Sequence, residues 1–252
     1  MSGVPILELA DITVRYGAVQ ALSDVSLAVD DGAFVGLIGP NGAGKTSLFN
    51  VISGFTKPYS GVTSFNGTRI PRAPHRRARL GLVRTFQNVG LNRSATVDEN
   101  LRAALTTGRF QVEFADLFGG SSDLERRILG FEETHQLFEL GKYRDVKVSD
   151  LSTGVAKMVE LACAVLRQPR LLLLDEPSSG LSPDETDRLG VVLRQLHAES
   201  DMSILMIEHD MPLIMRSAEY MVCLDFGTVI ARGTPAEVRN NKVVIDAYLG
   251  EG

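Results

Sequence analysis

The stretch Gly39-Pro40-Asn41-Gly42-Ala43-Gly44-Lys45-Thr46-Ser47 has the residue types and the spacing that bind phosphate. It reads G-x-x-x-x-G-K-T, in which glycines let the backbone approach an anion, the lysine reaches the phosphates and the threonine hydroxyl ligates Mg²⁺. An apolar run precedes it at residues 33–38, and a helix that Gly54 can cap follows through residues 48–52. Because helix N-termini attract anions, this order favours a nucleotide site over a chance glycine-rich turn with a surface lysine. The residues expected to contact the nucleotide here are Asn41, Gly42, Ala43, Gly44, Lys45, Thr46 and Ser47.

Two carboxylates form a second candidate group. Asp175 and Glu176 follow a continuous apolar run, residues 171–174, which is typical of a buried parallel strand. Asp175 is expected to hold Mg²⁺ through water, and Glu176 to act as general base for an attacking water. The alternative is a pair of solvated acids at a strand end, but the phosphate loop upstream favours the catalytic interpretation.

Three further residues lie beside predicted strands. His209 follows the strand of residues 203–207, and Gln87 ends the short strand of residues 82–86, where an α/β sheet carries its ligand-facing groups. A lone histidine is usually structural, but this position predicts a γ-phosphate contact for His209. Tyr16 precedes a turn at Gly17 between two strands. There it could stack on a nucleotide base or be a core or hairpin tyrosine, and the sequence leaves both readings open.

The elements that position these residues follow from hydrophobic periodicity. Alternation predicts antiparallel strands at residues 6–15 and 22–29, and Ser152 is a good N-cap for a helix over residues 155–167. Gly154 in the first turn of that helix costs stability, so something other than propensity requires it there. The other predicted strands cover residues 61–65, 220–225 and 228–232, and the other predicted helices cover residues 74–79, 183–198 and 242–249.

Residues 88–165 interrupt the alternation of strands and helices. Helical periodicity extends from Val97 to about Leu140, with residues 119–122 as a flexible link inside it. We therefore expect an inserted helical lobe. The basic residues of the preceding helix, 74–79, are expected to form a solvated face.

Composition excludes several classes of protein. The chain has 252 residues, of which 44% are hydrophobic, and a net charge of −5, which gives no basic footprint for nucleic acid. Cys163 and Cys223 lie in apolar runs without metal-type spacing, as expected for buried thiols in a reducing compartment. We find no secretory signal and no apolar run of about 18 residues, so we expect a cytosolic chain that works at a membrane only through a separate protein.

With these residues assembled, the chain resembles the ATP-binding subunits of ABC transporters over essentially its whole length. Within that family it is similar to the LivG-type ATPases of branched-chain amino-acid uptake, by residues 48–54, 84–88, 207–211 and 247–250. The motifs that carry the resemblance are Tyr16 as the A-loop, Gly39 to Thr46 as Walker A, Gln87 as the Q-loop, Leu151-Ser152-Thr153-Gly154 as the signature, Asp175-Glu176 as the end of Walker B, Ser179 to Ser182 as the D-loop and His209 as the switch histidine.

The resemblance implies an α/β fold, a P-loop NTPase of ABC type with a mixed central sheet, an antiparallel β-subdomain and an inserted helical lobe. The whole chain would be one nucleotide-binding domain, with residues 1–87 and 166–252 as the ATP-binding core and 88–165 as the lobe with the signature. It implies ATP and Mg²⁺ as cofactors. The implied site residues are Glu176, His209 and Gln87 for catalysis, Tyr16 with the phosphate loop for ATP, and Thr46, Gln87 and Asp175 for the metal.

The resemblance also implies partners. Two such subunits, identical or different, would close head to tail, so that Ser152, Thr153 and Gly154 contact the ATP bound by the partner. Gln87 and the lobe would contact an integral membrane permease at the cytoplasmic face, and a periplasmic or extracellular solute-binding protein would act indirectly. The signature departs from Leu-Ser-Gly-Gly-Gln at Thr153 and Val155, and the D-loop has Ser182 in place of its usual acid, which puts the efficiency of one ATP site in doubt.

Several alternatives are compatible with the sequence. An importer of this type could carry another small solute, such as urea or an organic acid. A non-transport ABC ATPase would be expected to show a long coiled coil or a second phosphate loop, and neither is present. A small-molecule kinase with a helical lid is disfavoured by the signature and by His209.

Overall fold

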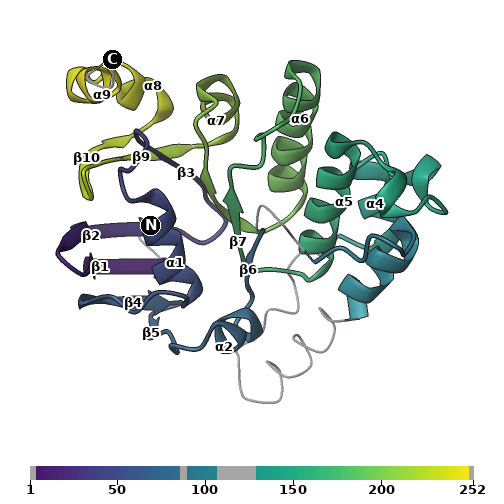
Figure 1. Ribbon diagram of the computed structural model, residues 1–252, viewed down its shortest axis with the longest axis horizontal. Helices are drawn as coiled ribbons and strands as arrows, with labels where there is room; N and C mark the ends of the chain where they lie inside the picture. Colours follow the sequence, from purple (N-terminus) through teal and green to yellow (C-terminus); the bar gives the residue numbers. More distant parts are fainter. Residues whose placement is uncertain (1–3, 86–89, 107–128, 250–252) are drawn as a thin grey trace. The chain divides into compact units, whose positions relative to one another are not determined.

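A computed structural model describes residues 4–85, 90–106 and 129–249 of the chain. The chain forms two compact units (Figure 1). The first comprises residues 1–77 and 203–252, and the second comprises residues 78–202. The expected lobe, residues 88–165, lies within the second unit, and its boundaries stay a prediction.

The first unit contains two sheets. Its strands are β1 (Leu7–Tyr16), β2 (Val19–Val29), β3 (Phe34–Ile38), β4 (Ser60–Phe65), β5 (Thr68–Arg69), β8 (Ser203–Ile207), β9 (Tyr220–Asp225) and β10 (Thr228–Gly233). One sheet is antiparallel, in the order β2-β1-β4-β5, and β1 and β2 pair from Leu7 opposite Val29 to Tyr16 opposite Val19. The other sheet is mixed, because β3 is parallel to both β8 and β9, whereas β9 and β10 are antiparallel. This arrangement confirms the predicted mixed sheet and antiparallel subdomain.

Short helices complete the first unit. They are α1 (Lys45–Ser53), α7 (Met211–Ser217), α8 (Pro235–Arg239) and α9 (Lys242–Leu249), while α2 (Pro74–Arg79) crosses the sequence boundary between the units. Figure 1 shows α8 and α9 beside β9 and β10, the strands they contact. The central strand β3 is buried at every residue, because neighbouring strands and helices exclude water from it.

The second unit is mostly helical. Its elements are β6 (Leu82–Arg84), a helical stretch at residues 97–106, α4 (Phe131–Leu137), the 3₁₀ turns Gly141–Tyr143 and Val148–Asp150, α5 (Thr153–Leu166), β7 (Leu171–Asp175) and α6 (Pro183–Glu199). The strands β6 and β7 are parallel, with Leu82 opposite Leu171. Helix α4 packs against both α5 and α6 (Figure 1). The predicted helical periodicity is confirmed at residues 97–106 and 131–137, and the proposed link at 119–122 lies outside the described residues.

The predicted solvated face of helix 74–79 is confirmed at Arg76 and Arg79, which are exposed, but the prediction was wrong for Arg77. Arg77 of the basic helix is not on a solvated face but is 5% exposed. Its guanidinium donates hydrogen bonds to the carbonyls of Pro71, Val51 and Ile52, two of which belong to the last turn of α1. Burial lowers the pKa of Arg77 to about 10. The buried charge is tolerated because three carbonyl oxygens, two of them in the last turn of α1, accept its hydrogen bonds.

Both cysteines are buried, as predicted. Burial raises the pKa of the Cys163 thiol and of the Cys223 thiol to about 12, so both are protonated and unreactive at neutral pH. Among the described residues, no helix is long and apolar enough to cross a membrane.

Candidate active site

The phosphate loop joins the central strand of the mixed sheet to a helix. It leaves the end of β3, and α1 begins at Lys45, with Gly44 as N-cap and Gly54 as a left-handed C-cap. The N–H groups of the first helical turn have no intrahelical acceptor, so they are available to an anion. The predicted order of strand, glycine loop and helix is confirmed, and so is the cap at Gly54.

Two glycines of the loop are required by close approach as well as by backbone conformation. Gly39 has φ of +146°, and a Cβ there would lie 2.0 Å from the carbonyl oxygen of Leu224. Gly44 has φ of +101°, and a Cβ there would lie 2.6 Å from the carbonyl oxygen of Ala21. Any larger residue would displace backbone at either point. The loop therefore has its shape only because both positions lack a side chain.

Lys45 folds back over the loop. Its Nζ donates hydrogen bonds to the carbonyls of Gly39, at 2.5 Å, and Pro40, at 2.8 Å, and the residue is only 8% exposed. The Thr46 side chain beside it is exposed, and Ser47 is half-buried. The ammonium charge is thus held at the loop, next to the exposed Thr46 and the half-buried Ser47 of the first helical turn. That arrangement can attract and neutralise a phosphate.

His209 lies at the same edge of the mixed sheet as the phosphate loop. Strands β3 and β8 are parallel neighbours with Leu37 opposite Ile207, so their carboxyl ends meet, and His209 follows the end of β8. Glu208 is fully buried and accepts the backbone N–H groups of His209 and Asp210 at 3.1 and 3.2 Å. The His209 side chain is 61% exposed. The predicted phosphate contact is compatible with this placement and stays a prediction.

Tyr16 ends β1 opposite Val19, across a two-residue turn. Its side chain is 48% exposed, and its hydroxyl forms a hydrogen bond of 3.3 Å with the Thr56 hydroxyl. These observations exclude a core tyrosine and leave a hairpin position with an accessible ring. Base stacking stays a prediction, and Gln87 lies outside the described residues.

Asp175 ends β7 and Glu176 follows it, and the four leucines of the strand are fully buried, as predicted. Asp175 forms an ion pair of 2.6 Å with Arg84, and both side chains are nearly buried. Glu176 has φ of +48°, the left-handed region that is uncommon for residues other than glycine. Such strain is often found at functional positions. Sequence reasoning missed Arg84 because its partner is on a different strand.

The two carboxylates line a cavity of about 370 Å³ in the second unit. Thr153 of the signature stretch lines it too, as do Lys157 and Glu160 of the same helix. The Lys157 ammonium donates hydrogen bonds to the carbonyls of Pro177, at 3.1 Å, and Ser179. Burial raises the pKa of Glu160 to about 7, against the attraction of Lys157, which lowers it. The structure thus brings the signature helix next to the residues that follow β7.

The signature stretch begins α5. Ser152 is the N-cap, as predicted, and its hydroxyl accepts the Val155 N–H at 3.3 Å. The glycine at position 154 has a packing reason, because a Cβ there would lie 2.0 Å from the Glu185 carboxylate. Glu185 in turn accepts the Ser182 N–H and hydroxyl at the start of α6, and these hydrogen bonds lower the pKa of Glu185. Gly154 therefore makes room for the capping box of the next helix.

The chain matches two protein families. Residues 22–179 match the family described as ABC transporter, and residues 228–252 match the family described as branched-chain amino acid ATP-binding cassette transporter. The high-affinity branched-chain amino acid transport ATP-binding protein BraF of Pseudomonas aeruginosa is 39% identical, over 98% of each chain. The corresponding protein LivG of Escherichia coli K12 is 38% identical, also over 98% of each chain.

Solved structures agree with these matches. The ADP conformation of an ATP-binding cassette of an ABC transporter has a TM-score of 0.80 and 28% identity, covering 98% of this chain and 99% of that one. A nucleotide-free ATP-binding cassette has a TM-score of 0.76 at the same identity, covering 97% and 98%.

Proposed function

This chain belongs to the ABC transporter family, and we propose that it is the ATP-hydrolysing subunit of an importer for branched-chain amino acids. The observation that carries the proposal is the loop between β3 and α1, whose two sterically required glycines and folded-back Lys45 have the arrangement that suits a bound phosphate. The two family matches, and relatives of nearly identical length that are named for branched-chain amino acid transport, support the substrate class.

The hydrolytic chemistry is phosphoryl transfer to water. The loop and Lys45 bind the phosphates of ATP, Glu176 is the general base for the attacking water, and His209 and Gln87 contact the γ-phosphate and the water. In such reactions the protein contributes mainly position and charge stabilisation. Tyr16 stacks on the adenine, for which its accessible ring is suited.

The proposal includes Mg²⁺, because this ion prefers hard oxygen donors and the implied ligands supply hydroxyl, carboxylate and amide oxygens. The exposed Thr46 hydroxyl in the first turn of α1 and the Asp175 carboxylate, with Gln87, are the residues that would hold it. When bound, the ion neutralises charge that develops on the transferred phosphoryl group.

The partners are a second ABC ATPase subunit, identical or different, and membrane permease subunits. The second subunit docks head to tail, so that Ser152, Thr153 and Gly154 contact the ATP of the partner. The chain then works as a peripheral protein at the cytoplasmic face, and a periplasmic or extracellular solute-binding protein delivers the solute to the permease.

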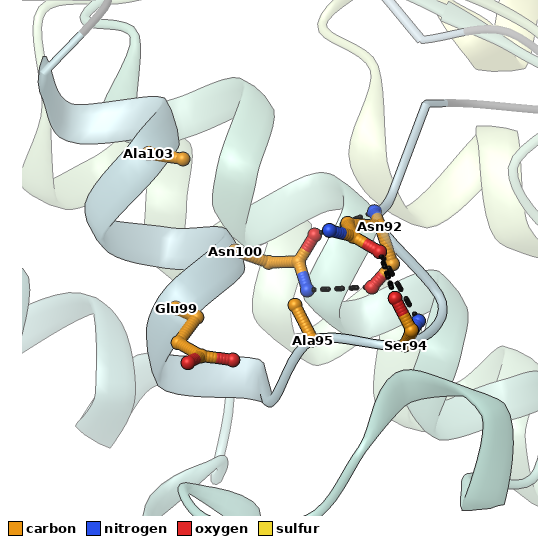
Figure 2. A pocket seen from close by; sticks show the side chains of 6 residues that line it. All are labelled: Asn92, Ser94, Ala95, Glu99, Asn100 and Ala103. Carbon is orange, nitrogen blue, oxygen red and sulfur yellow. Dashed lines mark hydrogen bonds between the residues drawn. The ribbon is translucent and has the colours of Figure 1, made fainter.

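The helical lobe of this chain carries a surface to which the permease would bind. A hollow of about 440 Å³ is lined by six residues, whose side chains Figure 2 shows: Asn92, Ser94, Ala95, Glu99, Asn100 and Ala103. Asn100 holds its rim, since its side chain accepts the Asn92 N–H and donates to the carbonyls of Asn92 and Thr96. Because these hydrogen bonds already hold the polar rim, a permease segment that docks there would not incur the entropy cost of ordering the rim.

The test is ATP binding by the purified chain, followed by uptake in cells. We expect Lys45→Ala to weaken binding of a fluorescent ATP analogue by at least about tenfold, because it removes the main side-chain charge of the loop. Lys57→Ala, at an exposed lysine shortly after α1, is the matched control. In cells that lack the chain, the parent gene should restore leucine uptake and the Lys45→Ala gene should not. Equal affinity of the two lysine variants, or uptake of only an unrelated solute, would refute the proposal.

A further inference from the structure

The C-terminal helix contacts the first residue of the phosphate loop. The backbone N–H of Gly39 donates a hydrogen bond of 2.9 Å to the hydroxyl oxygen of Tyr248, in the last turn of α9. The two residues are 209 positions apart in the sequence. The contact lies within the first unit.

Gly39 is held at three points. Tyr248 accepts its N–H, Lys45 donates to its carbonyl at 2.5 Å, and the Leu224 carbonyl closes the space where a Cβ would be. Because the Gly39 carbonyl is also an anchor of the Lys45 ammonium, a rotation of Gly39 would move the charge that the loop presents. The Tyr248 hydroxyl thus fixes the backbone to which the phosphate-binding lysine is attached.

The helix that carries Tyr248 is fixed by its own packing. Asn241 begins it by accepting the Val243 N–H with its side chain, at 2.9 Å. Val244 is buried, and Tyr248 lies one turn later on the same face. Val243, Ile245 and Leu249 are exposed. The helix therefore directs one face inward, and the tyrosine on that face reaches the loop.

We propose that Tyr248 is a positioning residue for nucleotide binding, through which α9 sets the conformation of the phosphate loop. This inference rests on the proposed function of that loop. It makes the C-terminal segment, which lies far from the loop in sequence, a part of the nucleotide site. Tyr248→Phe should keep the packing of the ring and remove only the hydroxyl, so it tests the group that accepts the Gly39 N–H.

The experiment compares the full-length parent with Tyr248→Phe and with Leu249→Ala, a control at an exposed residue of the same helix. We expect Tyr248→Phe to raise the dissociation constant for Mg-ATP by about three- to tenfold, the range that corresponds to the net contribution of one hydrogen bond. The KM for ATP should rise more than kcat falls. Amide exchange at Gly39, followed by NMR with ¹⁵N-glycine, should accelerate in Tyr248→Phe. Leu249→Ala should match the parent in affinity and in exchange.

The outcomes separate this inference from the proposed function. If the parent binds no ATP, or binds it no better than Lys45→Ala, the proposed function is wrong. If the parent binds ATP and Tyr248→Phe binds it equally well, the inference is wrong. A lower melting temperature of Tyr248→Phe with unchanged affinity and unchanged Gly39 exchange would show a purely structural contact and would also overturn it.

Discussion

Arg84 and Asp175 form a nearly buried ion pair, in which Nη2 of Arg84 donates to Oδ2 of Asp175 at 2.6 Å. The two residues belong to neighbouring parallel strands, β6 and β7. Asp175 is the carboxylate proposed to hold Mg²⁺, and Arg84 lies three residues before Gln87. The charge of the proposed metal-binding carboxylate is therefore balanced by an arginine of the neighbouring strand.

Loss of the Arg84 cation should destabilise the fold. We expect Arg84→Met to lower the free energy of unfolding by about 3 kcal/mol, because it leaves a carboxylate almost buried without its partner. Urea denaturation checks this. Arg188→Met removes an exposed pair with Glu139 in the same unit and should cost less than about 1 kcal/mol. An equal loss of unfolding free energy in the two variants would mean that burial of the Arg84–Asp175 pair does not add to its contribution to stability.

Glu176→Gln should stop turnover without preventing ATP binding. The amide keeps the shape of the side chain but cannot accept a proton from water, so hydrolysis should fall by about 10²-fold or more. Phosphate release under saturating Mg-ATP and equilibrium binding of the same preparation measure the two effects. Hydrolysis near the parent rate would show that Glu176 is not the general base.

Glu160 should make stability depend on pH. Its pKa is about 7 in the folded protein, raised by burial from an ordinary value of 4.5. The protonated carboxyl therefore stabilises the fold fully below pH 4.5, and that contribution is lost as pH rises through 7. Glu160→Gln keeps a neutral side chain, so it should be more stable than the parent at pH 8.5, by about 1 kcal/mol for a partly screened site.

Thermal unfolding at pH 5.0 and pH 8.5 tests this prediction. The advantage of Glu160→Gln should shrink toward zero at the lower pH. Glu8→Gln, at an exposed residue of β1, should show no such dependence. An advantage that is the same at both values would mean that Glu160 acts through packing or hydrogen bonding and not through its charge.

Gly154→Asp should act in two separable ways. Its Cβ would displace Glu185 and add a like charge beside it, which should cost about 1–2 kcal/mol of stability. In the assembled transporter its carboxylate would also face the γ-phosphate of the partner's ATP and suppress hydrolysis. Adding Glu185→Ala should recover part of the stability but not the ATPase rate. Recovery of both would show that the signature acts only through local packing.

The sequence predicted the local features of this fold and site well. The phosphate loop, the Ser152 cap and the buried strand before Asp175 are encoded by neighbouring residues, through glycine conformation, capping and hydrophobic runs. The Arg84–Asp175 and Gly39–Tyr248 contacts were not predicted, because they join segments that only the folded topology brings together. Arg77 was mistaken for a solvated residue for the same reason, since its acceptors lie on another helix.

The hydrogen bonds from Lys157 to the carbonyls of Pro177 and Ser179 constrain motion within the second unit. They join the second turn of α5 to the segment directly after Glu176, so the two cannot separate without breaking a charge-assisted contact. A tilt of α5 would therefore carry with it the backbone next to Glu176, the proposed general base. In the proposed head-to-tail dimer, docking of a partner's nucleotide on Ser152 would then be mechanically coupled to the position of Glu176 in the same subunit, and Lys157 would contribute to that coupling.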